Sequence, residues 1–467
     1  MNTKDLLRLG LPVGEPIQLA HQFIQDFIAQ GNDSALLEAE ILNIVADPTA
    51  FFSDALRAPL ARAIYRPAFT PRAELAPWRQ WGEGLETEAV KQMANACALP
   101  VAVAGALMPD AHVGYGLPIG GVLATDNAVI PYAVGVDIAC RMKLTVYDRK
   151  ANTLAGQRDR LANIIETETR FGMGCSFKQR REHDVMDEDW SVSPVTQRLR
   201  DKAWSQLGTS GSGNHFVEFG AFTVDSVQAS ELGLEPGEYL ALLTHSGSRG
   251  TGAQVCDFYS KRAMARHQHL PKELKHLAWL SLDDADGQEY WAAMNLMGQY
   301  AAANHALIHK HIAKKLGAHV ILDIENHHNF AWKETHVVNG EAREVIVHRK
   351  GATPAGAGVL GIIPGSMASP GYVVRGKGLP ESLQSASHGA GRVMSRTKAM
   401  QSFTWSATKK LLAERGVELL SAGLDEVPGV YKDIHAVMAA QTDLIEVLGQ
   451  FDPKLVKMCP AGDRAED

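Results

Sequence analysis

Five residues of the types that bind metal ions stand in short polar segments: Asp137 and Cys140 in VGVDIAC, His215 in GSGNHF, His245 in LLTHSGSRG and His328 in ENHHN. One thiolate can bridge two divalent ions, and imidazole and carboxylate ligands suit manganese or zinc. Each residue alone is more often an ordinary hydrogen-bonded side chain than a ligand. Their shared setting in glycine-rich loops at the ends of apolar runs favours a common metal site.

A histidine surrounded by small residues forms a second candidate site, in the segment SASHGAGRVMSR. Small residues let backbone N–H groups approach phosphate oxygens, and an arginine can clamp a phosphate with two hydrogen bonds. A neutral imidazole can attack an activated phosphoryl group, and nearby metal ions would offset charge on a leaving pyrophosphate. The alternative is a helix start with a buried polar histidine. The residues of this candidate phosphate site are Ser387, His388, Gly389, Ala390, Gly391 and Arg392.

Two further loops, HRKGATPAGAGVLG and IIPGSMASPGYVVRGKG, are rich in glycine and carry cations and a serine. They are consistent with more contacts to phosphates or to a nucleic-acid backbone. The same charges, taken singly, also fit a solvated rim. The residues concerned are Lys350, Ser366, Arg375 and Lys377.

The composition bounds the class of protein. The chain has 467 residues, of which 45% are hydrophobic and 21% charged, which is typical of a soluble globular protein with no bilayer-spanning run. The N-terminus is too polar for a secretory signal, and five scattered cysteines indicate a reducing cytoplasm. The formal charge of −7 argues against non-specific coating of nucleic acid, so such a substrate needs a local basic cleft.

These candidate residues need elements that position them. Residues 16–63 carry apolar residues at helical spacing and precede a proline-rich segment, which predicts a helical extension and linker over 1–75 and a catalytic domain over 76–467. From about residue 100, short apolar runs such as VGVDIAC and HVILDIENHHN predict strands that end in polar loops. Residues 290–317 and 434–449 predict helices between them. We therefore expect an α+β fold with its chemistry at strand ends.

Nine motifs together resemble the RtcB family of RNA-splicing ligases, in the order that the family shows. They are MPDAHVGYGLPIGGVLAT, VGVDIAC, GTSGSGNHF, HSGSRG, HHN, HRKGA, GIIPGSM, RGKG and SHGAGRVMSR, within roughly residues 90–457. The resemblance implies stacked β-sheets flanked by helices around a metal-containing cleft. DIAC in place of the family's commoner DIGC is a small departure, and the N-terminal helical extension is a larger one.

The resemblance also implies roles for individual residues. It implies two manganese ions bridged by Cys140, with Asp137 and His215 completing one ion's ligands and His245 and His328 the other's. It implies that GTP is a cosubstrate and that its GMP becomes attached to His388. The GTP-contacting residues it implies are Asn214, Glu218, His328, Asn329, Ser366, Met367, Ser387, Gly389, Ala390, Gly391, Arg392, Tyr431 and Lys457, and the RNA-contacting ones are Arg249, Lys350 and Lys377.

In the family, guanine recognition involves a lysine at the end of the chain. Family members typically end at a Lys-Gly whose lysine touches guanine, whereas this chain ends FDPKLVKMCPAGDRAED. Lys457 is the better match to that lysine, and Lys454 is the alternative.

The implied reaction joins an RNA 3′-phosphate, or a 2′,3′-cyclic phosphate after opening, to a 5′-hydroxyl. Two other functions remain as alternatives: a metal-dependent phosphoesterase that releases phosphate without GTP, and a non-catalytic RNA-binding paralogue. Retention of all five candidate metal ligands and of the SHGAGR loop argues against both. The choice between tRNA splicing and RNA repair, the oligomeric state and any activating protein partner stay open.

Overall fold

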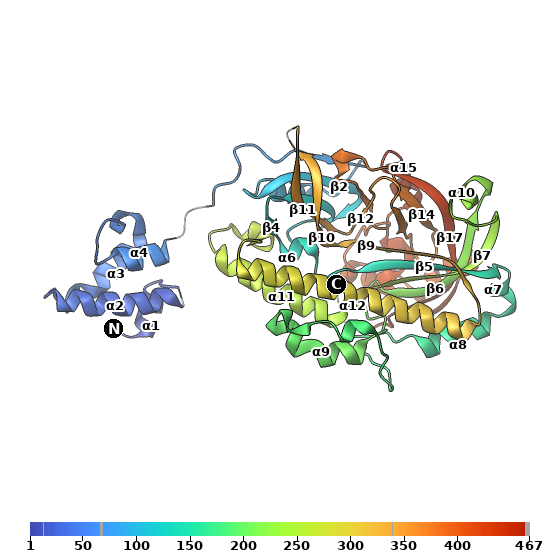
Figure 1. Ribbon diagram of the computed structural model, residues 1–467, viewed down its shortest axis with the longest axis horizontal. Helices are drawn as coiled ribbons and strands as arrows, with labels where there is room; N and C mark the ends of the chain where they lie inside the picture. Colours follow the sequence, from blue (N-terminus) through green and yellow to red (C-terminus); the bar gives the residue numbers. More distant parts are fainter. Residues whose placement is uncertain (13, 66–68, 339, 463–467) are drawn as a thin grey trace. The chain divides into compact units, whose positions relative to one another are not determined.

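The chain folds into two compact units, Met1–Phe69 and Thr70–Asp467, in a computed structural model that describes residues 1–12, 14–65, 69–338 and 340–462 (Figure 1). The division falls between Phe69 and Thr70, while the sequence placed the boundary at residue 75. Residues after the division already belong to the larger unit, since the backbone N–H of Arg72 donates to Ala98 O at 3.0 Å.

The smaller unit is helical, as the apolar spacing predicted. The Asn2 side chain caps its first helix and accepts from the backbone N–H groups of Lys4 and Asp5, which stabilises a short helix. Its helices are α1 (Thr3–Arg8), α2 (Glu15–Ala29), α3 (Leu37–Ala46) and α4 (Ala58–Ile64). Their inward faces form one apolar core, which includes Leu6, Phe23, Phe27, Ile41, Ile44 and Leu60.

Two β-sheets form the larger unit. The five-stranded sheet runs in the order β1 (Trp78–Gln80), β2 (Ala102–His112), β3 (Ile119–Thr125), β11 (Glu341–Lys350) and β10 (Asn329–Val338). The eight-stranded sheet runs β13 (Leu360–Ile363), β14 (Gly371–Gly376), β17 (Ile445–Met458), β6 (Phe216–Val224), β7 (Gly237–Ser246), β5 (Arg141–Lys150) and β9 (Val320–His327), with β16 (Glu418–Ser421) beside β17. Two short pairs are β12 (Ala352–Pro354) with β15 (Ser385–Ser387), and β4 (Ala128–Val129) with β8 (Leu280–Ser281).

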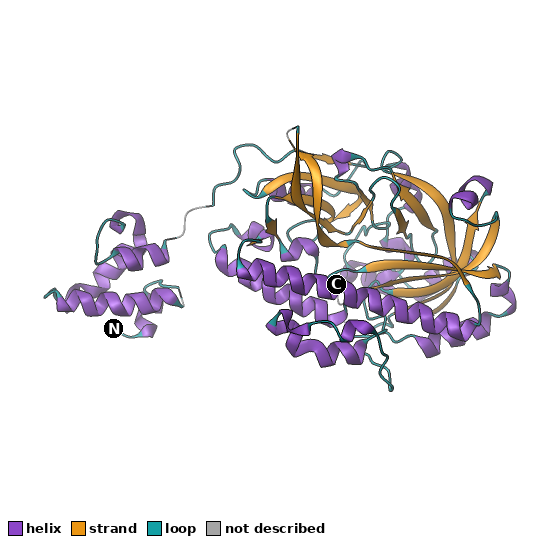
Figure 2. Cartoon of the chain, in the orientation of Figure 1, coloured by secondary structure: helices purple, strands orange, loops and turns teal. Residues whose placement is uncertain are grey.

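The two sheets share an apolar core. Val122 and Val347 from the five-stranded sheet lie in one buried cluster with Ile363 and Val374 from the eight-stranded sheet. Burying these faces against each other removes apolar surface from water, which is the main force that stacks the sheets. The expected α+β architecture with stacked sheets is confirmed (Figure 2).

Helices cover the other face of the eight-stranded sheet (Figure 2). Ile164 of α8 (Arg158–Glu168) and Ile308 of α12 (Ala285–Leu316) pack in one buried cluster with Val217 of β6. The remaining α-helices are α5 (Thr87–Cys97), α6 (Pro131–Val134), α7 (Thr153–Gly156), α9 (Pro194–Gln206), α10 (Ser226–Glu231), α11 (Arg249–Arg266), α13 (Arg396–Ser402), α14 (Trp405–Glu414) and α15 (Ile434–Ala439).

Two predicted elements differ in the structure. VGVDIAC forms no strand, because residues 135–140 make a loop that leads into β5, so Cys140 precedes a strand instead of ending one. The helix predicted over 434–449 ends at Ala439, and its second half enters β17. In the part of the chain that the structure describes, we find no helix long and apolar enough to cross a membrane.

Candidate functional site

Neighbouring strands bring the predicted metal ligands together. Cys140 directly precedes β5, His245 lies near the end of β7 and His328 directly follows β9, and β5 is paired with both other strands. His215 directly precedes β6, which pairs with β7. Because these strands are antiparallel neighbours, the end of one and the start of the next meet at the same edge of the sheet.

The five side chains form two groups that share the Cys140 thiol. Cys140 Sγ lies 3.0 Å from His245 Nε2 and 3.3 Å from His215 Nε2. His245 Nε2 lies 3.2 Å from His328 Nε2, and His215 Nε2 lies 3.0 Å from Asp137 Oδ2. All five residues are buried, and each group places its ligand atoms within 4.8 Å of one another. These two groups are the two ligand sets that the resemblance to the RtcB family implies.

The electrostatics favour the protonation states in which these residues bind metal. Burial and the neighbouring His215 lower the pKa of His245 to about 3, and burial holds the pKa of His328 well below its ordinary value. Burial alone would raise the pKa of Asp137, but the hydrogen bond and charge of His215 lower it to about 2. Neutral imidazoles and an ionised carboxylate are metal-binding forms, so the donor set fits divalent cations.

The backbone around the cluster orients its ligands. His245 Nδ1 donates to Asn214 O at 3.1 Å, which leaves the Nε2 lone pair facing the cluster. Asp137 Oδ1 accepts from Ser248 N at 2.9 Å. A Cβ on Gly247 would lie 2.1 Å from Asp137 Oδ2, so only glycine lets this carboxylate take its place.

Arg249 is buried, and its guanidinium donates hydrogen bonds within the protein. The residue is 1% exposed, and its Nη1 donates to Ser210 O at 2.8 Å and to Ser246 Oγ at 3.1 Å. A Cβ on Gly211 would overlap this guanidinium. In this structure the side chain supports the loop that carries His215, and the RNA contact expected for Arg249 stays a prediction.

His388 is held by a carboxylate that the sequence analysis did not assign. It follows β15, and its Nδ1 lies 2.7 Å from Asp110 Oδ2, which also accepts from the backbone N–H groups of His388 and Gly389. Asp110 is fully buried; burial alone would raise its pKa, but the charge and hydrogen bond of His388 lower it. An ionised Asp110 fixes the proton on Nδ1 and leaves Nε2 as a nucleophile.

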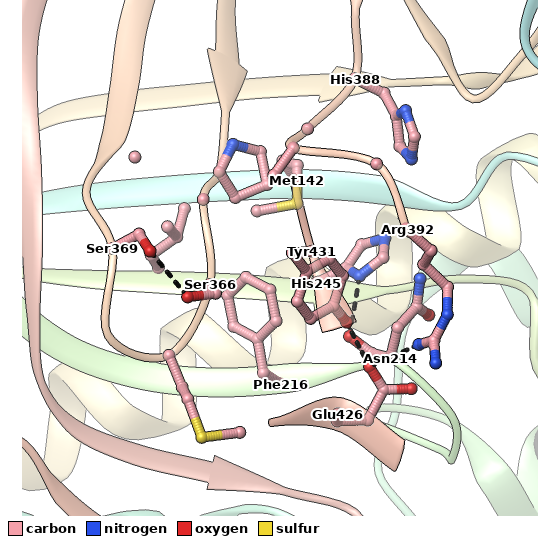
Figure 3. Close-up of a pocket in the computed structure, with 18 of the residues that line it drawn as sticks. Met142, Asn214, Phe216, His245, Ser366, Ser369, His388, Arg392, Glu426 and Tyr431 are labelled. Carbon is pink, nitrogen blue, oxygen red and sulfur yellow. Dashed lines mark hydrogen bonds and ion pairs between the residues drawn. The ribbon is translucent and has the colours of Figure 1, made fainter. Parts of the chain in front are cut away.

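Two cavities lie beside His388 and the metal-binding side chains, and Figure 3 shows residues that line the first of them. Their volumes are about 130 and 610 Å³. The first opens over the eight-stranded sheet, and the second reaches Asp137, Cys140 and the β2–β3 loop. Both are lined by His112, Ile119, Asn214, His245, His328, His388 and Arg392. The ring centroids of His328 and His388 lie 5.0 Å apart, so the candidate nucleophile lies beside the metal-binding side chains.

Most of the residues expected to contact GTP line the first cavity. They are Asn214, Glu218, His328, Ser366, Met367, Gly389, Ala390, Gly391, Arg392 and Tyr431. Asn329 lines the second cavity instead. Ser387 is fully buried, and its backbone N–H donates to Gln441 Oε1 at 2.9 Å.

Lys457, the residue expected to contact guanine, is not among the residues that line the first cavity. Alternate residues of a strand face opposite sides of a sheet, and Val456 and Met458 both line this cavity. Lys457 points to the helix-covered side, where its Nζ pairs with Glu166 of α8. Its contact with guanine stays a prediction.

An acidic residue that we did not predict orders one wall of the first cavity. Glu426 is 2% exposed and accepts hydrogen bonds from Tyr431 and Arg396, and from Arg392 Nη1 at 3.3 Å (Figure 3). Arg392 Nη2 also donates to Asp425 O at 2.8 Å. Nothing in the spacing around Glu426 indicates this role, because its partners come from other segments.

The two predicted RNA-contacting lysines differ in setting. Lys350 lines the second cavity, where its Nζ donates to Tyr115 O at 2.6 Å and burial lowers its pKa to about 7. Lys377 is exposed, donates to Thr442 O at 2.6 Å and lines neither cavity. Their contacts with RNA stay predictions.

Comparison with known proteins agrees with the geometry. Residues 92–193 and 183–458 match the family model described as "tRNA-splicing ligase RtcB". The chain is 34% identical to the RNA-splicing ligase RtcB of Escherichia coli, over 80% of this chain and 95% of that protein. It is 31% identical to the tRNA-splicing ligase RtcB of Methanococcus maripaludis, over 81% and 92% of the two chains. Because the match covers most of the chain and most of these relatives, the chain belongs to the RtcB family.

Proposed function

We propose that this protein is an RNA ligase that joins a 3′-phosphate or 2′,3′-cyclic phosphate end to a 5′-hydroxyl end in the cytoplasm, with GTP as cosubstrate. The observation that carries the proposal is the pairing of His388 with buried Asp110 beside a cluster of metal-binding side chains. A positioned imidazole beside metal-binding side chains suits nucleotidyl transfer better than simple hydrolysis.

In the first step, the Nε2 lone pair of His388 attacks the α-phosphorus of GTP. A P–N bond forms, the bond to the β-phosphate oxygen breaks, and pyrophosphate leaves. The imidazole gains positive charge as this happens, and the Asp110 carboxylate at 2.7 Å from Nδ1 offsets it. Asp110 therefore both orients the nucleophile and stabilises the product.

The later steps transfer the GMP and then seal the strand. An oxygen of the RNA 3′-phosphate attacks the GMP phosphorus, and the breaking P–N bond returns its electron pair to His388. The 5′-hydroxyl of the second strand then attacks the activated 3′-phosphate, loses its proton and expels GMP. A cyclic phosphate end is first opened by hydrolysis.

The cluster would hold two manganese ions, with Asp137, Cys140 and His215 as ligands of one and Cys140, His245 and His328 as ligands of the other. Divalent ions in this place supply charge stabilisation at phosphorus and at the leaving groups.

A ligation assay tests the proposal. The purified protein is given one strand with a 3′-phosphate, one with a 5′-hydroxyl, GTP and manganese, and joined product is expected only when all four are present. Release of phosphate without GTP would support a phosphoesterase instead. RNA binding with neither reaction, unchanged in Cys140→Ala, would support a non-catalytic RNA-binding protein.

A further inference from the structure

Asn304 of α12 bridges two loops that lie next to metal-binding side chains. The residue is fully buried, its Oδ1 accepts from Gly208 N at 2.8 Å, and its Nδ2 donates to Gly247 O at 3.0 Å. Gly208 lies in the segment between α9 and β6 that ends at His215, and Gly247 directly follows β7. A backbone N–H can only donate and a carbonyl can only accept, so the carboxamide fits these two loops in one orientation.

The hydrogen bond to Gly247 O sets the direction of the next backbone N–H. The peptide bond between Gly247 and Ser248 is trans, so its C=O and N–H groups point to opposite sides. With the C=O directed at Asn304, the N–H is directed at Asp137, whose Oδ1 accepts from Ser248 N at 2.9 Å. One peptide unit thus links the position of Asn304 to the carboxylate of a candidate metal ligand.

The chain around this peptide has little local preference for that orientation. A Cβ at Gly247 would lie 2.1 Å from Asp137 Oδ2, so the position needs glycine, and glycine allows many backbone conformations. Arg249 has a φ of 58°, a left-handed conformation that arginine rarely adopts. Such a turn persists only where contacts with the rest of the fold hold it. Asn304 supplies one of these contacts from a helix outside the turn.

We propose that Asn304 is a positioning residue for one metal ion, the ion that Asp137, Cys140 and His215 would hold. Its carboxamide fixes the peptide that binds Asp137 and the segment that ends at His215, and so it sets the affinity of that ion. The other ligand set shares only Cys140 with this one, so its ion keeps its affinity. The inference rests on the proposed function for the presence of the two ions.

The test measures each ion separately, because the two ligand sets share Cys140. Manganese is titrated into the metal-free full chain, and free manganese is followed by electron paramagnetic resonance. In a His328→Ala background, which keeps the Asp137 set, Asn304→Leu should weaken manganese binding about tenfold or more, because it removes a contact that orients the ligands. In an Asp137→Ala background, the same substitution should leave the dissociation constant unchanged. Equal losses in both backgrounds, or no loss in the first, would overturn the inference.

Hydrogen exchange tests the same contact without metal. In the metal-free protein the Ser248 amide is protected by its hydrogen bond to Asp137, and Asn304→Leu should speed its exchange several-fold. If the wild-type protein or a background variant binds no manganese, this measurement still decides the role of Asn304. Absence of manganese binding in the wild type would count against the two-ion assignment alone. Unchanged exchange at Ser248 would contradict the role of Asn304.

Two further variants separate positioning from a general loss of stability. Asn304→Ser offers one polar atom in place of two and should act in the same direction, which keeps the test open if Asn304→Leu does not fold. Thr196→Val is the control, because Thr196 is fully buried on α9, donates to Trp190 O at 2.8 Å and lies outside both ligand groups. It should leave both dissociation constants and the exchange at Ser248 unchanged. Weaker manganese binding by Thr196→Val would show that any loosening of the fold is enough, and would contradict a specific role for Asn304.

Discussion

His388 Nδ1 lies 2.7 Å from Oδ2 of the fully buried Asp110, across 278 positions of sequence. The same oxygen accepts from the backbone N–H groups of His388 and Gly389. One carboxylate therefore sets the tautomer, the ring orientation and the backbone of the candidate nucleophile. Its role is that of a positioning residue.

Asp110→Asn should slow formation of the histidine adduct by roughly a hundredfold or more, because the amide cannot offset charge on the imidazole. His388→Ala, which has no nucleophile, should form no adduct at all and gives the background of the assay. Unchanged rates in a folded Asp110→Asn protein would show that the carboxylate only supports the loop.

Cys140→Ala should lose bound manganese and ligation together. The Sγ atom approaches His215 Nε2 and His245 Nε2, one from each ligand group, and alanine offers no donor atom. Cys97→Ala is the control, because Cys97 is buried against Gly105, outside both groups. Full manganese occupancy of Cys140→Ala in elemental analysis would contradict the assignment of Cys140 as a metal ligand.

Removal of residues 1–69 should leave adduct formation at His388 unchanged. The division into two units falls after Phe69, and residues 1–69 contain none of the candidate metal ligands and no residue of the His388 segment. We expect the truncation to alter RNA choice or solubility at most. A truncated protein that is folded by circular dichroism but forms no adduct would contradict this independence.

Lys350 should make RNA binding depend on pH near neutrality. Burial lowers its pKa to about 7, so the ammonium charge is present below that pH and is lost above it. Affinity for a 5′-hydroxyl strand should therefore fall as the pH rises from about 6 to about 8. Lys350→Met should bind more weakly and lose this dependence. Equal pH dependence in the variant would show that another group is responsible.

The sequence predicted the residues that do chemistry better than the contacts that hold them. Cys140 and His388 stand in short motifs whose residue types suggest their chemistry, but Asp110 meets His388 only through the fold. The pairing of Lys457 with Glu166 is a second contact that the sequence alone did not predict. A shift of one residue in a strand moves a side chain to the other face, and composition alone does not set the register of β17.

The loop over residues 135–140 is a third feature that the sequence alone did not predict. VGVDIAC has the composition of a strand, yet it forms a loop. On this loop, Asp137 and Cys140 both contact His215. The requirement of the site overrides the local preference of the chain.

We expect His388 to carry the nucleotide and to have no role after the nucleotide is transferred. Wild-type protein incubated with labelled GTP and manganese should hold an acid-labile label, and His388→Ala should hold none. The same variant, supplied with RNA already capped by GMP at its 3′-phosphate, should still join it to a 5′-hydroxyl strand, whereas Cys140→Ala should fail both tests. Covalent label on His388→Ala would contradict the nucleophile assignment, and failure of a folded, metal-loaded His388→Ala to seal the capped strand would show a second role for the histidine.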